Sequence, residues 1–119
     1  MATARKRKLS ASTDGRGIKV VATASTGTTI HTALLGTTLG SFDEVWLWAY
    51  NSDTVDRLLT IEFGGTTAPD DNVKVTIPTQ SGLQLVIPGL ILQNSKVVTA
   101  FAAAANVVTI QGFVNTITD

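Results

Sequence analysis

The fold is decided by a run of nine residues near the middle of the chain, Phe42-Asp43-Glu44-Val45-Trp46-Leu47-Trp48-Ala49-Tyr50. Successive side chains of a β-strand point to opposite sides, so the last three aromatic residues share one face and the aliphatic residues between them share the other. Both faces are apolar, and we expect both to be covered. One explanation is a central strand packed between a second sheet and a loop. The other is a strand with one face at a subunit interface, because Trp and Tyr anchor interfaces; the candidate interface residues are then Trp46, Trp48 and Tyr50.

Similar runs, rich in Val, Ile and Thr and bounded by Gly, Asn, Asp, Ser or Pro, lie on both sides of this one. This pattern is typical of strands and turns, and the best helical candidate, Ala100–Ala105, is too short to be stable alone. The strands are expected at 18–24, 28–35, 42–50, 57–63, 73–77, 82–87, 96–102 and 106–117. We therefore predict an all-β fold for residues 18–119, an antiparallel β-sandwich of about eight strands with jelly-roll-like topology.

Local patterns within the runs give finer expectations. The segment Leu59-Thr60-Ile61-Glu62-Phe63 alternates, so we expect Leu59 and Ile61 in the core and the polar side chains in water. Pro88 is expected to end its strand, because proline lacks the N–H that the ladder needs. Gly112 is expected to mark a bulge that turns both Ile110 and Phe113 into the core.

The composition limits what the surface of the chain can be. Only 15% of its 119 residues are charged, against about 25% in typical soluble domains, while 44% are hydrophobic. We interpret this as surface that a partner or another copy covers. The absence of cysteine excludes disulfides and thiolate metal sites. No signal peptide is visible, and the longest apolar stretch, 83–92, is about half the ~20 residues that cross a bilayer, so we expect a soluble protein without a membrane partner.

Charge is segregated along the chain although its formal net value is zero. Residues 1–20 contain six basic residues and one acidic residue, whereas the remainder contains three basic and eight acidic residues. We therefore predict that residues 1–17 form a basic, flexible N-terminal arm. Three roles are open for it: a solvated terminus, a tether to an acidic protein surface, or a nucleic-acid-binding arm. In the last two roles its binding residues are Arg5, Lys6, Arg7, Lys8 and Arg16.

No pattern in the sequence indicates catalysis. His31, the single histidine, is expected to face solvent or an interface, since no serine stands in a nucleophile elbow. The carboxylate pairs Asp43-Glu44 and Asp70-Asp71 should diverge, because neighbouring strand residues point apart. The loop at 63–72 has oxygen ligands but lacks the spacing of a calcium loop, and no phosphate-binding glycine motif is complete. We expect no enzymatic activity, no cofactor and no metal.

The chain resembles small virion structural proteins of tailed bacteriophages, of the head-decoration or capsid-cement kind, over roughly residues 40–117. The resemblance lies in Asp43-Glu44-Val45-Trp46-Leu47-Trp48-Ala49-Tyr50-Asn51, in Leu59-Thr60-Ile61-Glu62-Phe63-Gly64-Gly65-Thr66-Thr67-Ala68-Pro69-Asp70-Asp71 and in Ile87-Pro88-Gly89-Leu90. It implies a β-sandwich body on the capsid surface that contacts the major capsid protein and other copies of itself, as trimers or around symmetry axes. It also implies attachment through an extended terminal arm.

Two other functions are compatible with the same residues. A virion-borne module could bind host glycans through Trp46, Trp48 or Tyr50. A coat protein could instead use the basic arm to bind packaged nucleic acid, although the body is acidic and no aromatic residues alternate with the arm's cations.

Overall fold

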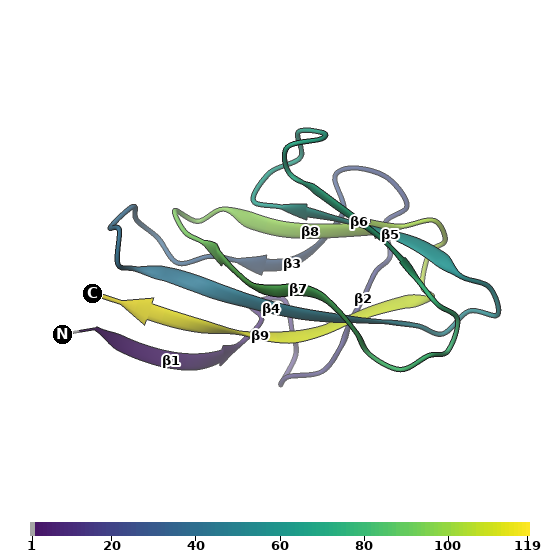
Figure 1. Cartoon of the computed structure of the whole chain (residues 1–119), viewed down its shortest axis with the longest axis horizontal. Helices are drawn as coiled ribbons and strands as arrows, with labels where there is room; N and C mark the ends of the chain where they lie inside the picture. Colours follow the sequence, from purple (N-terminus) through teal and green to yellow (C-terminus); the bar gives the residue numbers. More distant parts are fainter. Residues whose placement is uncertain (1) are drawn as a thin grey trace.

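The computed structural model describes residues 2–119, which form two antiparallel β-sheets packed face to face (Figure 1). Its nine strands are β1 (Thr3–Lys8), β2 (Ile18–Lys19), β3 (Thr28–Thr32), β4 (Phe42–Asn51), β5 (Arg57–Phe63), β6 (Asn72–Ile77), β7 (Gln84–Leu92), β8 (Val97–Ala102) and β9 (Val108–Thr118). These residues contain no helix, and so no helix long and apolar enough to cross a membrane.

The strand order is that of a jelly roll. Sheet A has the order β1-β9-β4-β7, with β2 also beside β9, and sheet B has the order β3-β8-β5-β6. Within these sheets β2 pairs with β9, β3 with β8, β4 with β7 and β5 with β6, all antiparallel. The first half of the chain therefore runs back along the second half as one long ribbon, which is rolled into two layers. The predicted β-sandwich is confirmed.

The core lies between the two sheets and is aliphatic. Val45, Leu47 and Ala49 of β4 are fully buried there, in one cluster with Leu59 and Ile61 of β5. Burying one such valine or leucine side chain contributes about 1.5–3 kcal/mol, so these positions fix which side of each strand faces inward.

The first 17 residues do not form a separate flexible arm, and this prediction is corrected for residues 2–17; Met1 lies outside the described residues. β1 pairs with β9 along its whole length, from Thr3 opposite Thr118 to Lys8 opposite Phe113. Leu9, only 1% exposed, belongs to the core. The four consecutive cations are tolerated because alternate strand residues point to opposite faces. The sandwich therefore begins at β1 and not at residue 18.

Two expectations about strand ends and bulges were wrong. β7 continues through Pro88, because it is an edge strand whose register shifts beside Trp46. β9 runs opposite β4 without a bulge, so Phe113 lies opposite Trp46 and points away from the core. Gly112 is needed for another reason: a Cβ atom there would overlap the carbonyl oxygen of Trp46 on the neighbouring strand.

Replacing Leu9 by Ala should lower the free energy of unfolding by about 2–5 kcal/mol, because it leaves a cavity in the core. Leu39→Ala is the matched control, since Leu39 is 96% exposed and its truncation should change the stability by less than about 0.5 kcal/mol. Urea denaturation measures both values. Equal, small losses for the two variants would restore the flexible arm.

Candidate functional site

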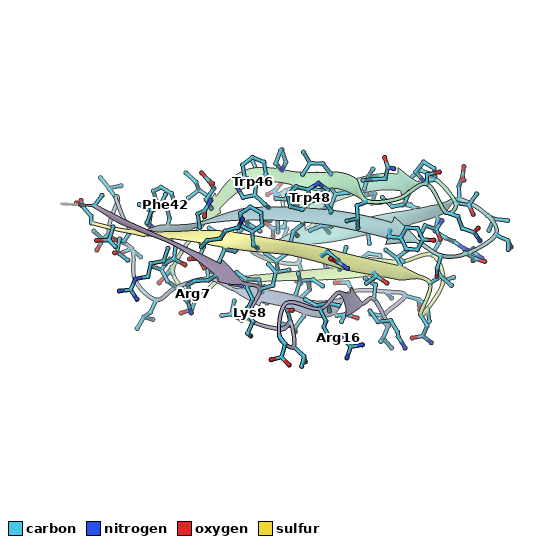
Figure 2. All side chains as sticks on the ribbon, turned by 90° about the horizontal axis from the view of Figure 1, so that it is seen from below. Arg7, Lys8, Arg16, Phe42, Trp46 and Trp48 are labelled. Carbon is cyan, nitrogen blue, oxygen red and sulfur yellow. The ribbon has the colours of Figure 1, made fainter. Side chains whose placement is uncertain are left out.

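The outer side of sheet A carries a group of aromatic rings, which we call the aromatic face: Trp46 and Trp48 of β4 with Phe113 of β9. The ring centroids are 6.3 Å apart for Trp46–Trp48, 6.4 Å for Trp46–Phe113 and 5.9 Å for Trp48–Phe113, and the ring planes are nearly parallel. Figure 2 shows Trp46 and Trp48 side by side on β4. All three side chains are half-buried. Each ring therefore keeps part of its surface available to a partner.

Neighbouring residues fix the orientation of Trp46. Its indole Nε1 donates a hydrogen bond of 2.7 Å to Glu44 Oε1, and the amide of Asn115 donates to the same oxygen at 3.0 Å. The hydrogen bond from Asn115, followed by that from Trp46, lowers the pKa of Glu44, so the carboxylate stays charged. On β7, Gly89 has a φ of 77°, and a Cβ there would lie 2.7 Å from the indole ring. These neighbours leave the indole ring one orientation, and a larger residue at position 89 would clash with it.

The three predicted interface residues share this outer side, as their alternation indicated. Neither a second sheet nor a loop of this chain buries this side fully, so that explanation was wrong, while the subunit-interface explanation stays a prediction. Trp46, Trp48 and Tyr50 are only half-buried. Among the described residues, Tyr50 takes part in no ring contact. Phe113 was assigned to the core on the expectation of a bulge. The unbroken alternation of Val108, Ile110 and Val114 was the signal that could have placed it outside.

The five predicted arm residues lie in four different environments. Lys6 places its Nζ 4.2 Å from the ring centroid of Phe113, a cation–π contact that adds a positive charge to the aromatic face. Lys8 donates to the carbonyl oxygen of Ser12 at 2.9 Å. Arg5 and Arg7 line a groove of about 570 Å³ on the inner side of β1. Arg16 lies apart from them, in the turn that its amide closes with Thr13 (Figure 2).

His31 is buried, and its predicted place facing solvent or an interface is corrected. A register shift in β3 between Thr29 and His31 turns both Ile30 and His31 inward, so that His31 is 4% exposed. Its Nε2 lies 2.6 Å from Asp43 Oδ2 across the two sheets, and Thr116 donates to the other Asp43 oxygen at 2.7 Å. The pair therefore joins β3 of sheet B to β4 and β9 of sheet A.

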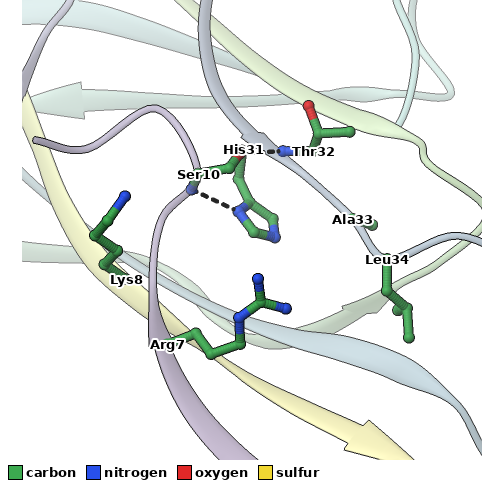
Figure 3. Close-up of a pocket in the computed structure, with 7 residues that line it drawn as sticks. All are labelled: Arg7, Lys8, Ser10, His31, Thr32, Ala33 and Leu34. Carbon is green, nitrogen blue, oxygen red and sulfur yellow. Dashed lines mark hydrogen bonds between the residues drawn. The ribbon is translucent and has the colours of Figure 1, made fainter.

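The second nitrogen of His31 is also occupied. The backbone amide of Ser10 donates to Nδ1 at 3.0 Å, as Figure 3 shows. A nitrogen that accepts this bond carries no proton, so the proton is on Nε2 and is donated to Asp43. A catalytic histidine needs this lone pair to accept a proton from a nucleophile. In this arrangement the lone pair instead holds the chain between β1 and β2 in place.

Glu62 was expected in water and is also buried, at 1% exposure. The connection between β2 and β3 passes over the outer side of sheet B and supplies the Gly27 amide, which donates to Oε1 at 2.8 Å, and the Ser25 hydroxyl, which donates to Oε2. Thr99, opposite Glu62 on β8, donates to Oε1 at 2.7 Å. Burial acts to raise the pKa of Glu62, but these hydrogen bonds together outweigh it, so the pKa is lowered.

The other carboxylates do not gather into a site. Asp43 points inward and Glu44 outward, as predicted for neighbours on a strand. Asp71 accepts the amide of Thr67 within its own loop. Over residues 2–119 there is no cluster of three or more His, Cys, Asp or Glu side chains that could hold a metal ion.

Glu62 should make the stability depend on pH. A carboxyl group whose pKa is lowered by folding stabilises the protein above its unfolded pKa of about 4.5, and this contribution is lost as the pH falls through the folded value. Glu62→Gln should cost about 1–3 kcal/mol at neutral pH and lose less stability than the wild type below pH 4.5. Urea denaturation over a pH series measures this difference. Parallel curves for the two proteins would contradict the role of Glu62.

Comparisons with protein-family models, with curated proteins and with solved structures found no match to this chain. No residue role can therefore be transferred from a relative. The aromatic face, the basic strand β1 and the buried polar groups carry what can be inferred about function.

Proposed function

We propose that this chain is a non-enzymatic structural protein of a tailed-bacteriophage virion, which docks its aromatic face on the capsid and stabilises the shell. The observation that carries this proposal is the ordered, half-buried group of Trp46, Trp48 and Phe113 on the outer side of sheet A. Tryptophan is enriched in the energetic centres of interfaces. Glu44 and Gly89 fix the orientation of the Trp46 ring before a partner binds, so less conformational entropy is lost on binding.

Apolar residues of β7 extend the aromatic face toward the edge of sheet A. Leu85 lies opposite Trp48 and is 50% exposed, and Ile91 lies opposite Glu44 and is also exposed. A contiguous apolar surface with charged neighbours is typical of protein–protein contacts. This apolar surface also accounts for part of the low proportion of charged residues in the chain.

The virion setting rests on the resemblance of residues 43–51, 59–71 and 87–90 to capsid-decoration proteins. Jelly rolls are common in viral capsid and lectin domains, although a fold alone does not determine function. A capsid offers many equivalent sites, so each copy needs only modest affinity when it bridges neighbouring subunits. The partners proposed here are the major capsid protein and further copies of this chain, at the capsid surface.

Glycan binding is the second candidate, favoured by the polar groups around the rings. Glu44 and Asn115 lie beside Trp46, and aromatic rings next to carboxylate and amide groups suit the apolar faces and hydroxyl groups of a sugar. The two candidates use the same surface, so they are separated by the ligand and not by the residues.

Trp46→Ala and Trp48→Ala should each weaken co-sedimentation with genome-free capsids of the same virion at least about tenfold, because interface tryptophans carry much of the binding energy. Since both side chains are only half-buried whereas Leu47 is fully buried, the loss of stability should be smaller than for Leu47→Ala in the core. Leu39→Ala, at an exposed position between β3 and β4, is the control for binding.

Capsid binding that is unchanged in both tryptophan variants would overturn the docking role of the aromatic face. If the wild-type protein does not bind capsids but is retained on immobilised oligosaccharides, glycan binding replaces the proposal. Retention by nucleic acid alone would move the chain to the packaging class.

A further inference from the structure

β1 is an edge strand with one open side. All six of its residues pair with β9, and the strand order of sheet A begins at β1, so its other side faces no strand of residues 2–119. The backbone N–H and C=O groups on that side are free to pair with an additional strand.

The positively charged side chains of β1 point alternately to the inner and the outer face of sheet A. Arg5 and Arg7 lie opposite Thr116 and Val114, on the side that faces the space between the sheets, while Lys6 and Lys8 lie on the outer side. In Figure 3 the guanidinium of Arg7 points toward the ring of His31, and Lys8 leaves the strand on the other side. Over residues 2–119 the basic side chains in contact with a carboxylate are His31, hydrogen-bonded to Asp43, and Arg57, paired with Asp53, so no β1 cation pairs with a carboxylate.

Adjoining grooves lie beneath the open side of β1. One has a volume of about 610 Å³ and the other about 570 Å³, and both are lined by Arg7 and Leu34. The first also includes Ser10 and Thr32, and the second includes Arg5. A strand placed beside β1 would direct every second side chain over these grooves, toward two guanidinium groups and one leucine.

The charges select which strand can be added. Two copies of β1 paired edge to edge would place cations opposite cations, and a like-charged pair directly opposite destabilises a sheet. An acidic strand instead places carboxylates opposite the cations of β1, above all opposite Arg5 and Arg7 on the inner side. Arg5 and Arg7 are two residues apart, so they match carboxylates that repeat at the two-residue period of a strand.

We propose that the open edge of β1 binds an extended acidic segment of a partner protein, which joins sheet A as an additional strand. This inference deepens the proposed function and rests on it for the nature of the partner. Nucleic acid fits the same cations less well, because it cannot use the free backbone groups of the edge. In addition, Lys6 and Lys8 are already engaged with Phe113 and Ser12.

The test is the binding of a short fluorescent peptide of alternating glutamate and valine to the full chain, followed by anisotropy. The peptide should bind, and its affinity should fall severalfold between low and high salt, because salt screens exposed charges. Two versions of the peptide, N-methylated along one backbone edge or the other, identify the strand contact. One should bind like the parent peptide, and the other should lose at least about tenfold, because several hydrogen bonds are blocked.

Charge reversal supplies the matched variants. The double variant Arg5→Glu/Arg7→Glu should no longer bind the glutamate peptide and should instead bind a peptide of alternating lysine and valine. Arg16→Glu should bind the glutamate peptide like the wild type, because Arg16 lies in a separate turn. All three reversed side chains are exposed, so thermal unfolding should show little change in stability.

Equal binding of both methylated peptides would overturn the proposal and leave only a basic patch. Tighter binding of an oligodeoxythymidine than of the peptide would overturn it in favour of nucleic acid, and no binding to any probe would also overturn it. The peptide assay contains no capsid and no tryptophan variant, so failure here with intact capsid binding refutes the edge alone. Peptide binding without capsid binding would refute the proposed function alone.

Discussion

The two-residue alternation of β4 is the constraint on which the rest of the structure depends. β4 is hydrogen-bonded to β9 on one side and β7 on the other, so its backbone cannot slip without breaking two ladders. A shift by one residue would exchange its faces, moving Val45, Leu47 and Ala49 into water and two tryptophans into a core filled by small aliphatic side chains. Each buried valine or leucine contributes about 1.5–3 kcal/mol, so the core decides the register. The aromatic residues are outside because the inside is already filled.

The same constraint explains why the outer rings are ordered without being buried. Gly112 lets the backbone of β9 approach β4, and this close pairing sets Phe113 directly opposite Trp46. Gly89 leaves room on β7 for the edge of the Trp46 indole, and Glu44 fixes its nitrogen. Stacked aromatic pairs contribute about 0.5–1.5 kcal/mol beyond their buried area, which is enough to favour one arrangement at a half-buried site. Glycines on β7 and β9, the two strands beside β4, thus determine how the tryptophan rings of β4 pack.

The sequence predicted those features that depend on one strand at a time. Strand positions, the sandwich and the shared face of Trp46, Trp48 and Tyr50 follow from residue type and period. It failed where two segments distant in sequence decide the outcome. β1 is a strand because β9 extends beyond β2 and offers it an edge, and Leu9 anchors it in the core. Glu62 is buried because the β2–β3 connection brings Ser25 and Gly27 to it, and His31 is buried because a bulge meets an acid on the other sheet. The sequence pattern around each of these residues does not predict which distant segment it will contact.

The outer sides of the two sheets differ in a way that favours one partner for both proposed contacts. The β2–β3 connection covers sheet B at Glu62 and Thr99, whereas the aromatic rings on sheet A are only half-buried. The open edge of β1 belongs to sheet A as well, and Lys6 joins the two surfaces through its contact with Phe113. A segment added to β1 would therefore hold the rest of its own protein beside the aromatic face. Binding at one surface then raises the effective concentration at the other, so two weak contacts can give firm attachment without either being strong alone.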